Sequence, residues 1–234
     1  MSADLSAGPR IPLVPLPDIV HFPCTDLKLQ ILEPYYQRMM RDLVEHVDED
    51  DRQIGLVLLK PAGWIRDPEP DLEFFRAGTL ARLLDVELWA DGRVDLWLHG
   101  EQRFELTEAW HGGTCRRAVV RLLEEPLVNE NDAGIVAVRG SILELARSLS
   151  GALGESFPVP VDEIDELSST DCRFEEVVNR IAADLDLPAL RKLELLVETL
   201  PERGLSMLSI LKNRHQVVDL LRPFRHLAGS PDSN

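Results

Sequence analysis

The sequence predicts an α+β protein in which a β-rich N-terminal half precedes an all-helical C-terminal half. Short apolar segments with a period of two recur from residue 11 to about residue 123, and an Asp91-Gly92 pair separates two of them. After Pro126 the apolar residues recur every three or four positions, which is the period of an amphipathic helix. The 234 residues, 44% of them hydrophobic, are enough to bury a core.

The β-rich half begins with a proline-rich segment. The prolines in residues 11–17 hold the backbone extended and remove hydrogen-bond donors, so this segment is not a helix. Residues 27–32 alternate apolar and polar side chains, which is typical of a half-buried strand. Residues 54–59 form an uninterrupted apolar run, which indicates a strand buried on both faces.

One helix is predicted within this half, beginning near Pro34. Proline is favoured in the first turn of a helix, and apolar residues follow it at helical spacing: Tyr36, Met40, Leu43 and Val47. The acidic residues 48–51 then form a solvated loop. Residues 61–71, rich in proline and charge, form a surface loop.

The clearest local signal is a β-hairpin around residues 90–93, because Asp-Gly is the preferred centre of a tight turn. Strands over 78–88 and 94–99 flank this turn. In the second strand Val94, Leu96 and Leu98 alternate with other residues, so we expect these three to face inward and Trp97 to point away. The strand pattern continues at Phe104, Leu106 and residues 115–122. Several strands at this spacing predict a small barrel or folded sheet.

Four helices are predicted in the C-terminal half. The first has Asp132 as its N-cap, Gly151 as its end, and an apolar stripe of Ile135, Val138, Ile142, Leu145 and Leu149. A polar connection over 151–170 precedes three shorter helices, which have apolar stripes over 174–185, 190–200 and 205–218. Pro201 separates the last two.

These patterns divide the chain into four parts. We expect a flexible N-terminus at residues 1–10, a β-rich subdomain at 11–128, a helical bundle at 129–226 and a frayed tail at 227–234.

Charge and composition exclude several classes of partner. The net charge is −16, and no basic cluster is longer than Arg116-Arg117, so nucleic acid and anionic membranes are disfavoured. No apolar run approaches the roughly 18 residues of a membrane span, and no secretory signal opens the chain. The three cysteines, Cys24, Cys115 and Cys172, are too widely spaced for a disulfide framework. We therefore expect reduced thiols and a cytoplasmic protein.

No familiar catalytic motif is present. The sequence lacks a phosphate-binding P-loop, a dinucleotide fingerprint, an H-E-x-x-H pair and a G-x-S-x-G elbow. Residues 111–115 place a histidine near Cys115, but we interpret them as a turn between strands with Cys115 entering the core. The histidines show no ligand-like spacing. We expect no catalytic residues, no metal ion and no cofactor.

Four tryptophans in or near the β-rich half are the candidate binding residues: Trp64, Trp89, Trp97 and Trp110. Because Trp97 points away from the barrel interior, it either packs under the helical half or lines an exposed groove. An exposed aromatic groove would suit an extended peptide, since aromatic rings supply large contact areas.

Several motifs follow one another in a defined order. The β-rich half contains Ile11-Pro-Leu-Val-Pro-Leu-Pro-Asp-Ile-Val-His-Phe-Pro23, Ile54-Gly-Leu-Val-Leu-Leu59, Phe75-Arg-Ala-Gly-Thr-Leu-Ala-Arg-Leu-Leu84, Asp91-Gly92 and Gly100-Glu-Gln-Arg-Phe104. The helical half adds Asn179-Arg-Ile-Ala-Ala-Asp-Leu-Asp-Leu-Pro188, Lys192-Leu-Glu-Leu-Leu196 and Leu200-Pro-Glu-Arg-Gly-Leu205. As an ordered set over residues 11–221, they resemble the N-terminal substrate-binding domain of Lon proteases.

The resemblance implies an N-terminal PUA-like β pseudobarrel followed by a C-terminal helical bundle. It also implies a stand-alone module that binds unfolded or extended polypeptides, or a protease or chaperone partner, as an adaptor or regulator of proteolysis. In Lon the ATPase and Ser-Lys protease modules follow this domain, and this chain ends at Asn234. We therefore expect no enzymatic activity. The motif residues have structural interpretations: Gly78 and Gly100 at close backbone approaches, Arg103 bound to loop carbonyls or a carboxylate, and Phe104 in the core.

Two other functions remain open on the sequence. One is a small-molecule-binding protein or uncharacterised enzyme with a pocket in the β-rich half, which would need converging polar groups. The other is RNA binding through a basic face built from arginines such as Arg82, Arg103, Arg116 and Arg117, which the acidic composition disfavours.

Overall fold

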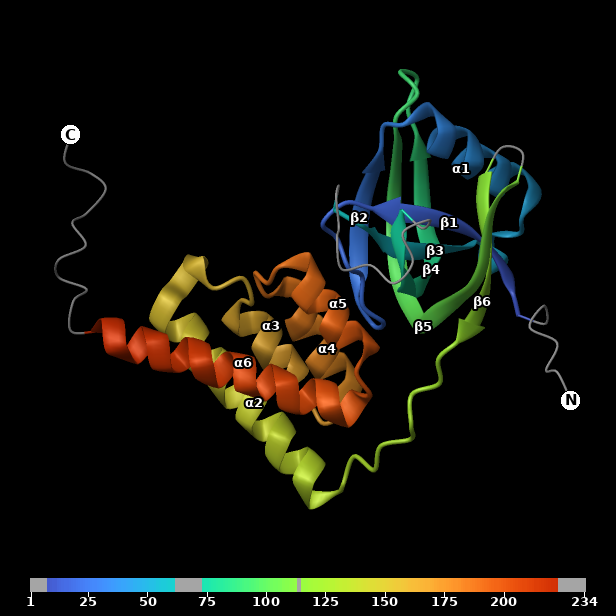
Figure 1. Ribbon diagram of the computed structural model, residues 1–234. Coiled ribbons are helices and arrows are strands. Elements are labelled where there is room, and N and C mark those ends of the chain that lie inside the picture. Colours follow the sequence, from blue (N-terminus) through green and yellow to red (C-terminus); the bar gives the residue numbers. More distant parts are fainter. Residues whose placement is uncertain (1–7, 62–72, 113–114, 223–234) are drawn as a thin grey trace, which may run out of the picture. The chain divides into compact units, whose positions relative to one another are not determined.

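The computed structural model describes residues 8–61, 73–112 and 115–222, apart from the side chains of Asp50, His111, Gly112 and Cys115. Two compact units are present. The first comprises the chain up to Pro126 together with Leu187–Glu198, and the second comprises Leu127–Asp186 and the chain from Thr199 onward. The first unit is β-rich and the second is helical (Figure 1), so the predicted α+β class is confirmed.

The chain termini fall largely outside this description. Of the expected flexible N-terminus at 1–10, residues 1–7 lie outside the described residues, and Arg10 already opens the first strand. The expected frayed tail at 227–234 lies outside the described residues altogether.

A six-stranded sheet curls into the predicted pseudobarrel. Its strands are β1 (Arg10–Leu16), β2 (Asp26–Ile31), β3 (Gln53–Leu59), β4 (Phe74–Leu88), β5 (Val94–Gly112) and β6 (Cys115–Leu122). They lie in the order β2-β5-β4-β3-β1-β6, and β5 also pairs with β6. Because β5 is 19 residues long, its first part pairs with β2 and its last part with β6. The second pairing closes the sheet on itself.

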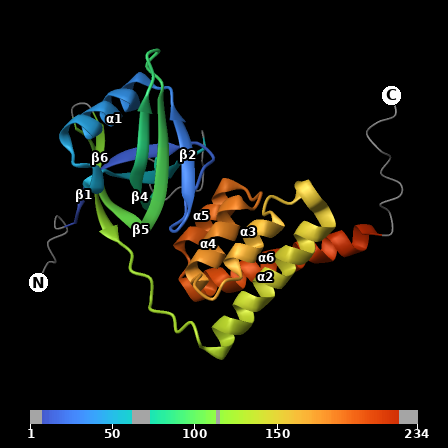
Figure 2. The ribbon, with the colours of Figure 1, turned by 180° about the vertical axis from the view of Figure 1, so that it is seen from behind.

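The hairpin between β4 and β5 forms at the predicted Asp-Gly pair. The backbone N–H of Trp89 donates to Arg93 O over 2.9 Å, and the N–H of Gly92 donates to Trp89 O over 3.0 Å. Gly92 has φ +95°, a left-handed conformation that glycine adopts without steric cost. β4 and β5 run side by side to this turn in both views (Figure 1, Figure 2).

The inward face of β5 is the one predicted. Val94, Leu96 and Leu98 are completely buried, and the intervening Trp97 is only half-buried on the opposite face. β3 is buried on both faces, as its unbroken apolar run predicted. Ile54 joins one apolar cluster of the barrel, and Val57 joins the other.

Helix α1 (Pro34–His46) seals the barrel at the end where the β4–β5 hairpin projects (Figure 1). Pro34 occupies its first turn, as expected. Met39, Met40 and Leu43 are buried and join the inward residues of the strands in one cluster. The predicted loop after this helix contains a single 3-10 turn, η1 (Glu49–Asp51).

Two glycines permit close approaches of the backbone, as their motifs implied. A Cβ atom on Gly78 would lie 2.3 Å from Leu56 O, and one on Gly100 would lie 2.2 Å from Phe22 O. Both distances are too short for any side chain. Phe104, four residues after Gly100, is fully buried, as expected.

Arg103 forms hydrogen bonds that hold helix α5 (Ala189–Val197) against the strands of the β-rich unit. Its guanidinium is 5% exposed, and its Nη1 donates to Leu196 O over 2.7 Å and to Glu198 O over 2.9 Å. Its Nε lies 2.6 Å from Glu125 Oε1. Arg103 therefore binds both carbonyls and a carboxylate. The sequence places α5 in the bundle at 129–226, whereas the structure groups it with the β-rich unit.

The helical unit contains α2 (Ala133–Leu153), α3 (Val161–Leu167), α4 (Phe174–Asp184) and α6 (Leu200–Leu221), with a 3-10 turn η2 (Gly154–Ser156) after α2. Asp132 caps α2 as predicted, because its Oδ1 accepts from Gly134 N at 2.9 Å and from Ile135 N at 3.2 Å. In the described part of the chain, no helix combines the length and apolarity needed to cross a membrane.

Three expectations about the helices were wrong. Helix α2 runs past Gly151 to Leu153 and has Gly154 as its C-cap, whose φ of +56° suits glycine. The connection predicted over 151–170 contains α3, a short helix that buries Ile164 and Leu167. The last helix, α6, is 22 residues long rather than short, with Pro201 in its first turn and a capping box between Thr199 and Glu202.

Replacing Leu96 by alanine tests the assignment of the barrel faces. Because Leu96 is fully buried, we expect Leu96→Ala to lower the free energy of unfolding by about 2–5 kcal/mol in urea titrations. The control is Glu87→Ala on the exposed face of β4, expected within about 0.5 kcal/mol of wild type. A loss below about 0.5 kcal/mol for Leu96→Ala would show that the faces are reversed.

Replacing Arg103 by methionine tests its role in holding α5. The substitution removes the donors to two carbonyls and leaves Glu125 without its cation, so we expect a loss of about 3–5 kcal/mol in the free energy of unfolding. Arg121→Met is the control, because Arg121 pairs with Glu105 at the surface and should contribute about 1 kcal/mol or less. Equal losses in the free energy of unfolding for the two variants would contradict a role of Arg103 in holding α5.

Candidate binding surfaces

The barrel has an open seam between β1 and β2. β1 pairs with β6 through Arg10–Pro12 and with β3 through Leu13–Leu16, so from Leu13 onward one of its edges has no neighbour among the described residues. Within the same described residues, β2 pairs with β5 alone. The two unpaired edges border one groove.

This seam groove has a volume of about 250 Å³ and is mainly apolar. It is lined by residues 14–17, Ile19, residues 29–33 and Tyr36. Burial raises the pKa of the Tyr36 phenol above its usual value. Leu32, at the end of β2, is 61% exposed and forms part of the lining. The groove therefore presents an apolar surface that solvent and a partner can reach.

The two edges of the groove differ in hydrogen-bonding capacity. On the β1 side Pro15 and Pro17 have no backbone N–H, so this edge is poor in donors. On the other side β2, with the sequence Asp-Leu-Lys-Leu-Gln-Ile, contains no proline. Only the β2 edge keeps every backbone donor and acceptor.

The outer face of β2, β5 and β4 forms a second hollow, here called the tryptophan face. It is about 440 Å³ in volume and is lined by Lys28, Leu29, Gln30, Glu87, Trp89, Asp95 and Trp97. Leu29 and Gln30 belong to both this hollow and the seam groove, so the two surfaces are continuous across β2. Trp97 thus lines an exposed hollow of the β-rich unit.

Each tryptophan of this face lies against a cation of the chain itself. Lys28 Nζ is 4.8 Å from the centroid of the Trp97 ring, and Arg93 Cζ is 5.1 Å from that of Trp89. Asp95 fixes the arrangement, because it accepts from Trp89 Nε1 at 2.8 Å and from Gln30 Nε2 at 2.9 Å. The face can therefore hold a cation between an indole ring and a carboxylate.

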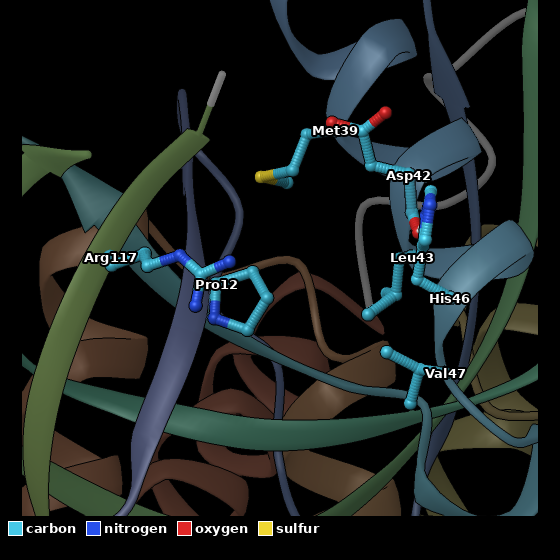
Figure 3. Close-up of a pocket in the computed structure, with 7 residues that line it drawn as sticks. All are labelled: Pro12, Met39, Asp42, Leu43, His46, Val47 and Arg117. Atoms are coloured by element: carbon cyan, nitrogen blue, oxygen red, sulfur yellow. Dashed lines mark hydrogen bonds between the residues drawn. The ribbon is translucent and has the colours of Figure 1, made fainter. Parts of the chain in front are cut away.

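A third cavity, of about 320 Å³, lies between α1 and the strands β1 and β6 (Figure 3). Pro12 and Arg117 face Met39, Asp42, Leu43, His46 and Val47 across it. His46 Nδ1 is 2.9 Å from the backbone oxygen of Asp42, so the imidazole donates within its own helix. These seven residues include no nucleophile paired with a base, and the cavity gives no support to a catalytic interpretation.

The other sequence candidates do not join these surfaces. Trp64 lies outside the described residues. Trp110 is half-buried on β5 opposite Arg117 and lines none of the three cavities. His111 and Cys115 stand on the two strands of a hairpin, as the turn interpretation predicted, and their side chains lie outside the described residues.

Among the described candidates, the histidines and cysteines form no metal-binding group, and three of the four arginines are buried or lie beside carboxylates. Within the described residues, no group of three or more histidine, cysteine, aspartate or glutamate side chains could hold a metal ion. Of the arginines considered for RNA binding, Arg103 is buried and Arg82 lies 2.8 Å from Glu101. Arg116 lies 3.2 Å from Glu73. The positive charges of Arg82 and Arg116 thus lie beside carboxylates, whereas an RNA interface needs such charges available to bind phosphate.

A buried histidine organises the loop between β1 and β2. His21 is 5% exposed, its backbone oxygen accepts from Thr79 Oγ1 at 2.6 Å, and its Nδ1 lies 3.4 Å from Thr25 Oγ1. Burial, reinforced by the charge of His99 and partly opposed by Asp26, lowers the pKa of His21 to about 4. The loop therefore packs against the barrel with a neutral imidazole at neutral pH.

The seam groove was not predicted from the sequence. Most of its lining comes from two segments that the sequence predicts to be extended, and periodicity does not show which strand edges remain unpaired. The prolines at positions 15 and 17 were the available signal, because proline within a strand marks an edge.

Comparison with known proteins identifies one family. The profile of the family described as "ATP-dependent protease La (LON) substrate-binding domain" matches residues 10–213. A Lon protease of Parabacteroides distasonis is 28% identical over 215 residues, which are 91% of this chain and 25% of that protein. A Lon protease of Escherichia coli K12 is 26% identical over 172 residues, which are 73% of this chain and 20% of that protein. The chain spans about a quarter of the length of the first relatives it matches.

Two solved structures share the fold. The N-terminal domain of a Mycobacterium avium complex Lon protease superimposes with a TM-score of 0.65 at 14% identity, over 87% of this chain and 98% of that one. A Lon N-terminal domain protein from Xanthomonas campestris gives a TM-score of 0.54 at 21% identity, over 86% of this chain and 98% of that one. The fold expected from the resemblance is confirmed.

The buried His21 predicts a loss of stability in mild acid. Its pKa is about 4 in the folded protein and 6.5 when exposed, so the unfolded chain binds the proton first as the pH falls. The stabilisation is complete above pH 6.5 and is lost progressively towards pH 4, amounting to about 2 kcal/mol between pH 7 and pH 5.

Urea titrations of wild type and His21→Asn at pH 7 and pH 5 measure this contribution. Asparagine does not titrate, so the wild type should lose about 2 kcal/mol more than the variant over this interval. Carboxylates elsewhere affect both proteins equally. Parallel pH dependences would show that His21 is protonated as readily in the folded state as in the unfolded state.

Proposed function

We propose that this chain, which belongs to the family of ATP-dependent protease La (LON) substrate-binding domains, binds unfolded or extended polypeptide segments without catalysing a reaction on them. The observation that carries the proposal is the apolar seam groove, open to solvent and continuous with the tryptophan face. Unfolded polypeptides expose apolar side chains that folded proteins bury, and a groove of this kind accepts them.

Exposed apolar residues extend the groove at the same end of the barrel. Leu32 follows β2, Leu88 ends β4 and Trp89 comes directly after it. At this end of the sheet Ile31, Val94 and Leu88 lie side by side in the register. Leu88 and Trp89 are 45% and 41% exposed. Several exposed apolar residues on neighbouring strands are typical of a binding surface rather than of an inert one.

We further propose that Trp89 and Trp97 contact the bound segment. Their indole rings supply a large contact area beside Asp95, and both lie in the hollow that adjoins the groove. Trp64 and Trp110 have no comparable support in the described part of the chain.

We propose an adaptor or regulatory role in proteolysis, with a protease or chaperone as the partner that receives the bound polypeptide. The relatives are Lon proteases, and the family profile names their substrate-binding domain. We place this role in the cytoplasm, where cysteines outside disulfides, such as Cys172, stay reduced.

Fluorescence anisotropy tests the binding function directly. The probe is fluorescein-labelled lysozyme, reduced and S-carbamidomethylated so that it stays unfolded, and native lysozyme of the same charge is the folded control. We expect saturable binding of the unfolded chain alone.

Two matched substitutions locate the binding surface. Leu32→Asp places a carboxylate in the apolar groove, so we expect the Kd for the unfolded probe to rise about tenfold. Leu205→Asp adds the same charge at an equally exposed leucine of α6, and its Kd should stay within about twofold of wild type. Equal weakening by both variants would refute the groove as the site, and equal binding of native lysozyme would refute selectivity for unfolded chains.

A further inference from the structure

We propose that the bound polypeptide joins the barrel as an additional β-strand along the free edge of β2, with apolar side chains in the seam groove and basic side chains over the tryptophan face. The inference rests on the proposed polypeptide-binding function and specifies its geometry and its preferred ligand. The occupant is thus an extended segment in which apolar residues alternate with lysine or arginine.

The alternation of hydrogen bonds along β2 identifies which of its backbone N–H and C=O groups are available to an added strand. Gly100 N–H donates to Thr25 O over 2.9 Å, and hydrogen-bonded pairs recur at every second residue of an antiparallel ladder. In the observed register, Leu27, Leu29 and Ile31 therefore direct their backbone groups to β5. The N–H and C=O groups of Lys28 and Gln30 point the opposite way, towards the seam. A strand placed there would satisfy all four groups.

The seam favours a strand from another chain over closure by β1. Pro15 and Pro17 leave the facing β1 edge short of donors, so it cannot complete a ladder with β2. The groove between the two edges has a volume of about 250 Å³. Its apolar walls would bury every second side chain of an added strand, since successive side chains point to opposite faces.

The charges on the outer face indicate which side chains of the added strand should point towards that face. On the outer face an added strand lies beside Lys28 and Gln30, and Gln30 already reaches across β2 to Asp95. Asp95 is two strand spacings, roughly 10 Å, from an added strand, so an extended lysine or arginine side chain directs its charge across β2 towards this carboxylate. The two indole rings of this face already hold the chain's own cations, Lys28 and Arg93. The net charge of −16 adds a long-range attraction for a basic segment.

The decisive variant is Gln30→Pro, with Gln30→Ala as its matched control. Both substitutions remove the side-chain bond to Asp95, but only proline also removes the N–H that points to the seam. The probe is a fluorescein-labelled ten-residue peptide of alternating valine and lysine. We expect Gln30→Pro to bind it at least about tenfold more weakly than wild type and Gln30→Ala within about threefold. Equal affinities of the two variants would overturn strand addition.

Amide hydrogen exchange on the wild-type protein gives a second test that requires no variant to fold. Saturation with the valine–lysine peptide should slow exchange at Lys28 and Gln30 at least about tenfold, since both N–H groups gain acceptors. Exchange at Leu29, already paired with β5, should change little by comparison. Unchanged exchange at Lys28 and Gln30 in the saturated complex would overturn the proposal.

The outcomes separate this inference from the function on which it rests. If wild type binds unfolded lysozyme and Gln30→Pro binds it equally well, strand addition is wrong and polypeptide binding stands. If wild type binds neither the peptide nor unfolded lysozyme, both proposals fail. A concentration-dependent dimer that Gln30→Pro abolishes would show that a second copy of β2, rather than a basic peptide, occupies the edge.

Discussion

Each edge of a β-strand can pair with only one neighbour at a time, and the architecture of the β-rich unit depends on how β5 meets this constraint. β4 occupies one edge of β5, and β2 and β6 share the other in succession. The change of partner falls near Gly100, where the loop carrying His21 and Phe22 approaches too closely for any side chain. The pairing with β6 closes the sheet. The pairing with β2 leaves that strand with an edge that no other described strand covers, and this edge becomes one wall of the seam groove.

The candidate binding surface follows from this incomplete closure. Because the barrel is open between β1 and β2, apolar residues such as Leu29 and Ile31, which face the interior, also line a groove that solvent can reach. Helix α1 seals the rest of the opening with Met39, Met40 and Leu43. The outer face of the same strands carries carboxylates and two tryptophans. An apolar groove and an acidic aromatic face therefore meet across a single strand, and this combination suits an extended segment with two different faces.

Much of the fold could be predicted from local patterns. The Asp91-Gly92 hairpin, the burial of Leu96 and the cap at Asp132 each depend on a few neighbouring residues, and all three are confirmed. Long-range partners could not be predicted in the same way. Periodicity identifies α5 as a helix, but its unit is shown by long-range contacts such as the bonds from Arg103 to Leu196 O and Glu198 O. The orientation of Trp97 was predictable from alternation, whereas the groove beside it depends on which strand edges lack a neighbour.

An unfolded polypeptide bound at the seam of the barrel would lie against the residues that line both sides of the groove. Photo-crosslinking with a benzophenone-labelled unfolded polypeptide, followed by mass spectrometric assignment of the linked residues, tests this most directly. We expect cross-links to concentrate on residues 14–19, on 26–33 and on the tip of the β4–β5 hairpin, all in the β-rich unit. Cross-links that concentrate instead on the helical unit, with the seam residues unlabelled, would contradict it.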